Sequence, residues 1–140
     1  MPVVLALTLG LSGCIPESRL YLGLVNGQLV IKTCEAIEAS GVDVSEVTPD
    51  SDSVDGDVMW KVSGHATLNV GDVIVVGRAP AGMVTDVPYT GDISPTSAYG
   101  VSIARDTDEP STVFGSFQGE GLEEGRWLRS GDPDPIDSPC

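Results

Sequence analysis

Residues 20–34, LYLGLVNGQLVIKTC, contain the clearest structural signal in this 140-residue sequence. Two apolar runs, residues 20–25 and 28–34, flank the dipeptide Asn26-Gly27. Asn and Gly both tolerate the positive φ angles of the tight turn that joins two antiparallel strands. The stretch therefore predicts a β-hairpin.

Short apolar segments continue along the chain beyond this hairpin. Val58–Ser63 alternates with a period of two, which places Trp60 on an inward face and predicts that its ring lies at the centre of the core. Asp72–Val76 is apolar on both faces, so a central strand is expected there. Alternating or apolar patterns predict further strands at residues 42–47, 99–103, 113–117 and 126–128.

The segments between these strands carry turn signals. Glu35–Gly41 is long enough for one helical turn, Gly64-His65 is expected to be a turn, and Gly77–Gly82 turns or runs extended because Pro80 has no backbone N–H. The pattern as a whole predicts an all-β fold: a single β-sandwich of immunoglobulin-like size, with seven or eight short strands over residues 19–129.

The composition agrees with a β-sandwich and narrows the classes of partner. There are 17 Gly and 10 Pro, which favour turns over long helices, and aromatic residues make up only 5% of the chain, so the core must be largely aliphatic. The formal net charge is −14. A surface of this sign repels nucleic acid, so no nucleic-acid partner is expected.

The first residues differ sharply from the rest. Residues 2–13 carry no charge and are too few to span a membrane as a helix, but their length suits the apolar region of a signal peptide. This run ends Leu11-Ser12-Gly13-Cys14, which resembles the lipobox of bacterial lipoproteins. The resemblance implies that signal peptidase recognises Leu11, Ser12 and Gly13 and removes residues 1–13. Cys14 would then carry diacylglycerol, and residues 14–18 would form a tether on the extracytoplasmic face of the cell membrane.

A second resemblance covers roughly residues 19–128. The order of a hairpin ending in Cys, a Trp strand, the segment Val76–Met83, a Tyr-x-Val strand and a Phe strand is similar to that of small uncharacterised lipoproteins of high-GC Gram-positive bacteria. In these, a segment of the form V-G-x-x-P-x-G-[FM] joins two strands. The family has no assigned activity, so the resemblance implies fold and location but no chemistry.

Lipidation of Cys14 would leave two cysteines, Cys34 and Cys140. An even pair outside the cytoplasm suggests a disulfide, although exported proteins can also carry free thiols. The bond would close a loop of about 106 residues and stabilise the fold by roughly 4–5 kcal/mol in the chain-entropy model. It would also hold residues 130–140, a Pro- and Asp-rich tail with no strand pattern of its own.

The sequence contains none of the familiar catalytic constellations. It has a single histidine, His65, and lacks the G-x-S-x-G, S-x-x-K and H-E-x-x-H motifs. Asp50–Asp57 is rich in acids but fails the EF-hand register, which requires an oxygen ligand where Val54 stands. No catalytic residue, metal ligand or cofactor is therefore assigned.

The sequence thus predicts a membrane-anchored, non-catalytic module that binds or scaffolds an unknown envelope protein or ligand. Two alternatives stay open: an envelope hydrolase that uses paired carboxylates, and a weak Ca²⁺-binding module built on residues 50–57. Several large side chains can line a binding groove or fill the core, namely Pro80, Met83, Tyr89, Tyr99, Phe114, Phe117 and Trp127.

Overall fold

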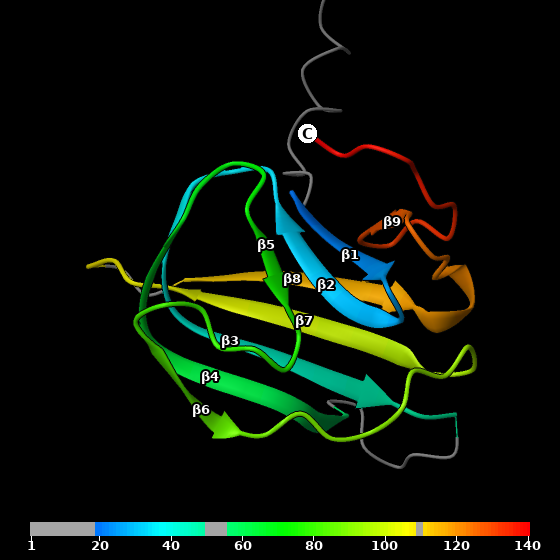
Figure 1. Cartoon of the computed structure of the whole chain (residues 1–140), viewed down its shortest axis with the longest axis horizontal. Coiled ribbons are helices and arrows are strands. Elements are labelled where there is room, and N and C mark those ends of the chain that lie inside the picture. The colour runs from blue at the N-terminus through cyan, green and yellow to red at the C-terminus, as the bar shows by residue number, and fades with distance from the viewer. Residues whose placement is uncertain (1–18, 50–55, 109–110) are drawn as a thin grey trace, which may run out of the picture.

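The computed structural model describes residues 19–49, 56–108 and 111–140, which form two facing antiparallel sheets (Figure 1). The strand order is β5-β2-β1-β9 in the four-stranded sheet and β6-β4-β3-β7-β8 in the five-stranded sheet. The predicted all-β sandwich is confirmed, with nine strands in the described residues where seven or eight were expected. The elements are β1 (Leu20–Val25), β2 (Gln28–Thr33), β3 (Ile37–Val47), β4 (Asp57–Leu68), β5 (Val73–Val75), β6 (Met83–Val87), β7 (Ala98–Arg105), β8 (Thr112–Gln118), the 3₁₀ turn η1 (Gly119–Gly121) and β9 (Trp127–Arg129).

The core lies between the two sheets and is mainly aliphatic. Trp60 is fully buried at its centre, as predicted, and its indole Nε1 has no hydrogen-bond partner among the described residues. Side chains at alternate positions of each strand supply the rest of the core. They include Leu20, Leu22, Leu29, Ile31, Ile74 and Leu128 from the four-stranded sheet, and Ile37, Val42, Val44, Val62, Tyr99, Val101, Ile103 and Phe117 from the five-stranded sheet.

The predicted hairpin is present as β1 and β2. Asn26 and Gly27 have φ angles of 53° and 75°, as the tight turn requires. The carboxylate of Glu124, nearly a hundred residues later, accepts hydrogen bonds from the backbone N–H groups of both turn residues. A side chain from the β8–β9 connection therefore holds a turn that local sequence already favours.

Two strands are longer than predicted. The prediction of a helical turn at Glu35–Gly41 is wrong, because β3 begins at Ile37. A bulge around Ser40 interrupts the register, and the strand continues beyond it to Val47. The turn expected at Gly64-His65 is also wrong, because β4 continues through these residues and Gly64 pairs with Met83 of β6. In both places a bulge or a glycine kinks a strand without ending it.

The region between β4 and β7 also differs from the prediction. β5 lies at the edge of the four-stranded sheet rather than at its centre, and Val73 is 49% exposed. An apolar run cannot by itself distinguish a central strand from an edge strand. β6 was not predicted, because only Met83 of its five residues is buried. The segment Val76–Gly82 connects β5 in one sheet to β6 in the other, so it joins two strands as the sequence pattern suggested.

The carboxyl-terminal tail is held against the sandwich by backbone hydrogen bonds, by the side chain of Arg126, which donates to Asp137 and Pro135, and by a disulfide. Trp127 exchanges two backbone hydrogen bonds with Ile136, and Cys140 forms the predicted disulfide with Cys34, at a Cα–Cα distance of 5.4 Å. The backbone N–H of Cys34 donates to the carbonyl of Arg19, so β1 begins beside the same disulfide (Figure 1).

The outer face of the four-stranded sheet carries the aromatic ring of Trp127. The ring of Trp127 packs on Gly23, where an added Cβ would lie only 2.6 Å from a ring carbon, and Trp127 is only 9% exposed. The ammonium group of Lys32 lies 5.3 Å from the centre of the same ring. This arrangement contrasts with the outer face of the five-stranded sheet, where the candidate site lies.

Candidate functional site

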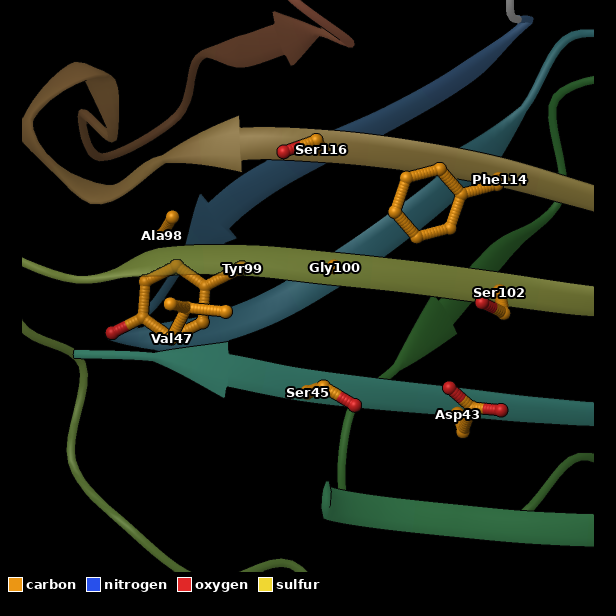
Figure 2. Close-up of a pocket in the computed structure, with 9 residues that line it drawn as sticks. All are labelled: Asp43, Ser45, Val47, Ala98, Tyr99, Gly100, Ser102, Phe114 and Ser116. Carbon is orange, nitrogen blue, oxygen red and sulfur yellow. The ribbon is translucent and has the colours of Figure 1, made fainter. Parts of the chain in front are cut away.

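The outer face of the five-stranded sheet is formed by side chains that the strand register brings into rows. Gly100 of β7 pairs with Ser45 of β3 on one side and with Ser116 of β8 on the other. In the next row Ser102 pairs with Asp43 and Phe114 in the same way. In these two rows the outward positions hold Gly100 and three serines beside the ring of Phe114 and the carboxylate of Asp43 (Figure 2).

These rows form the floor of a hollow of about 330 Å³. Phe114 lies on the outward face of β8 and is 58% exposed. Its ring leans over Gly100, where an added Cβ would lie 3.4 Å from a ring carbon. Figure 2 shows the ring nearly face-on between β8 and β7, so one face is turned outward from the sheet. The hollow is lined by Asp43, Ser45, Val47, Ala98, Tyr99, Gly100, Ser102, Phe114 and Ser116.

A second hollow of about 390 Å³ continues the first along the same face and shares Asp43 and Ser102 with it. We call the two together the outer-face groove. On β3 the groove extends from Gly41 to Val47. The second hollow is lined by Ser40, Gly41, Val42, Asp43, Lys61, Val62, Ser63, Ser102, Ala104 and Thr112.

Asp43 is the one carboxylate that lines this groove in the described part of the chain. Partial burial raises the pKa of Asp43 above its usual value, and the positive charge of Lys61, its neighbour on β4, acts in the opposite direction. A half-buried carboxylate beside hydroxyl groups is a strong hydrogen-bond acceptor for a ligand that carries O–H or N–H groups.

The large side chains considered as groove candidates separate into three groups. Tyr99 and Phe114 line the outer-face groove, while Pro80 and Tyr89 line other hollows near the β5–β6 connection. The remaining three are buried: Met83, Phe117 and Trp127. Tyr99 is also buried, and its hydroxyl accepts a hydrogen bond from the backbone N–H of Ser94 at 2.7 Å. This arrangement at the start of β7 has the geometry of a tyrosine corner.

His65 has a different environment from the one expected. Its Nδ1 lies 2.9 Å from a carboxylate oxygen of Asp106, and its Nε2 lies 3.2 Å from one of Glu38. All three side chains are more than half exposed and none of them lines the outer-face groove. The imidazole of His65 therefore lies between the two acids at the surface of the protein.

Other predicted site residues lie outside the described residues. These include Leu11, Ser12, Gly13 and Cys14, as well as most of the acidic segment considered for Ca²⁺, residues 50–55. Within the ranges that are described, no three His, Cys, Asp or Glu side chains are grouped closely enough to hold a metal ion. In the same ranges, no helix is long and apolar enough to cross a membrane.

The residues of the groove could not be assembled from sequence alone. Phe114 and Tyr99 were candidates, but Asp43, Gly100 and Ser102 were not, because their proximity depends on which strands pair and in which register. The signal available in the sequence was the run of small residues at alternate positions of β7, namely Ala98, Gly100, Ser102 and Ala104.

Comparisons with known proteins yield no further guide to the site. No protein-family model, curated protein or solved structure matches this chain.

Proposed function

We propose that this protein is a lipid-anchored, extracytoplasmic binding module without catalytic activity, and that it binds its ligand in the outer-face groove. The observation that carries the binding role is the groove itself. The exposed ring of Phe114 lies beside a floor of small side chains in this groove. Ligand sites in proteins are commonly hollows that combine an aromatic or apolar surface with a few polar groups, as this groove does.

Two features support the anchor and the location. The segment Leu11–Cys14 matches the lipobox pattern and directly precedes the folded domain. The bond between Cys34 and Cys140 is of a kind that persists outside the cytoplasm and is rare inside it. Because β1 begins next to this disulfide, a tether at residues 14–18 would hold that end of the sandwich toward the membrane.

The anchor is tested by mass spectrometry of the protein extracted from membranes. We expect a mature chain that begins at Cys14 and carries diacylglycerol, and we expect Cys14→Ala to prevent lipidation. Recovery of the wild-type chain in the soluble fraction with Met1 intact would overturn the anchor.

The binding role is tested with purified soluble protein that carries Cys14→Ser, added to isolated cell envelopes of the producing bacterium. We expect the protein to sediment with the envelopes in a saturable manner. Replacement of Gly100 by Val should reduce this binding, because the new side chain fills the floor beneath Phe114 without requiring a forbidden backbone conformation. Equal binding by this variant, or no binding by either protein, would overturn the role of the groove.

A further inference from the structure

We propose that the ligand of the outer-face groove is a neutral carbohydrate chain. This inference rests on the proposed binding role and adds the chemical class of the ligand. Three independent properties of the groove carry it: an outward-facing aromatic ring, a lining of hydroxyl groups, and the sign of the surrounding charge.

The first property is the orientation of Phe114. Its ring face is turned outward, and the ring extends diagonally from its partner Ser102 toward Gly100, which has no side chain, so the groove floor beside the ring is low (Figure 2). A flat apolar face of this kind suits the C–H face of a sugar ring, which is apolar in its centre and polar at its rim. An aromatic ring also buries a large apolar area when a ligand covers it.

The second property is the hydrogen-bonding capacity around that ring. Ser45, Ser102 and Ser116 have hydroxyl groups that both donate and accept, and Asp43 has a carboxylate that accepts. Thr112 and Lys61 add a hydroxyl group and a donor in the adjoining hollow. A ligand with many hydroxyl groups can satisfy both kinds of partner, whereas an apolar ligand would leave these groups unpaired.

The backbone around the groove argues against a peptide that adds as an extra strand. β7 is paired on both sides, with β3 and β8. At the outer edge of β8, the N–H of Ser116 donates to the hydroxyl of Ser130, and the carbonyl of Ser116 accepts from Gly131. The edge nearest the groove is thus occupied at this point, and recognition must use side chains.

The net charge of the protein and the length of the groove restrict the class of ligand further. A net charge of −14 disfavours a polyanion, so the carbohydrate is expected to be neutral. The groove extends from Gly41 to Val47 along β3, which spans about 20 Å at the rise of an antiparallel strand. A site of this length accommodates several consecutive sugars of a chain rather than one monosaccharide.

The experiment uses the soluble Cys14→Ser protein and cell envelopes treated in one of two ways. Periodate oxidation cleaves the vicinal diols of sugars, and protease digestion removes envelope proteins. We expect binding to be lost after periodate and retained after protease. Phe114→Ala should weaken binding to untreated envelopes about tenfold. The matched control Val70→Ala, which truncates a 62% exposed side chain outside the groove, should not change binding.

The outcomes distinguish this inference from the proposed function. Binding that withstands periodate but disappears after protease, and that still requires Phe114, would identify a protein ligand. It would overturn the carbohydrate while sparing the binding role. Binding that Phe114→Ala leaves unchanged would overturn the carbohydrate site in this groove. Absence of any binding to untreated envelopes would overturn both proposals.

Discussion

Removal of the Cys34–Cys140 disulfide offers the most quantitative test of the structure. The two residues are separated by 106 positions, so the bond restricts most of the unfolded chain. In the chain-entropy model, opening a loop of this size costs about 4.8 kcal/mol at 25 °C. Cys140 is exposed and Cys34 only partly buried, so replacing both by Ser adds no large cavity to this cost.

The loss of stability is measured by urea unfolding, monitored through tryptophan fluorescence, in protein that carries Cys14→Ser. With an m value of about 2 kcal/mol per molar urea, the unfolding midpoint should fall by about 2.4 M in the Cys34→Ser, Cys140→Ser variant. The parent protein in reducing agent provides the control, and its midpoint should match that of the variant. Two free thiols in the folded, unreduced parent, or a stability loss below about 1 kcal/mol, would refute the reasoning.

Three further predictions concern single side chains. Burial raises the pKa of Asp43 in the folded state above its usual 3.8, so the wild-type protein should lose stability as the pH rises through the titration of this group. The stability of Asp43→Asn relative to wild type should therefore increase between about pH 3 and pH 7. A stability difference between the two proteins that does not change with pH would contradict this. Tyr99→Phe removes the hydroxyl group that accepts a hydrogen bond from Ser94 and should lower the free energy of unfolding by about 1–2 kcal/mol, measured with urea. An unchanged unfolding midpoint would show that this hydrogen bond does not stabilise the fold. Glu124→Ala should speed hydrogen exchange at the Asn26-Gly27 amides, measured by NMR, while amides in β7 serve as the unaffected reference.

Features that depend on nearby residues were predictable from the sequence. The Asn26-Gly27 turn needs only two residues with positive φ, and Trp60 alternates with Val62 on the inward face of β4. The alternation does not extend to Val58, which is 46% exposed where the register of β4 against β3 shifts. The Cys34–Cys140 bond was also predictable, because the lipobox interpretation of Cys14 leaves a single pair. In each case the prediction depends only on neighbouring residues or on the number of cysteines.

Features that depend on tertiary pairing were not predictable. The apolar run at Asp72–Val76 lacks an alternating pattern, so nothing local distinguishes a central strand from the observed edge strand β5. His65 follows a glycine, which commonly marks a turn, yet the pairing of Gly64 with Met83 keeps β4 extended there. The groove was not predictable for the same reason, because its rows of side chains form only when β3, β7 and β8 pair in the observed register.

The position of β1 has a consequence for when the protein can fold during its synthesis. β1 pairs with β2, which follows it immediately, and with β9, which begins more than a hundred residues later. A chain that emerges amino end first therefore exposes one edge of β1 until nearly all of the domain has been released. Pairings between distant segments form slowly, and an exposed strand edge is prone to aggregation. The domain should thus acquire its structure only after release of β9, and chains truncated before Trp127 should depend on chaperones to stay soluble.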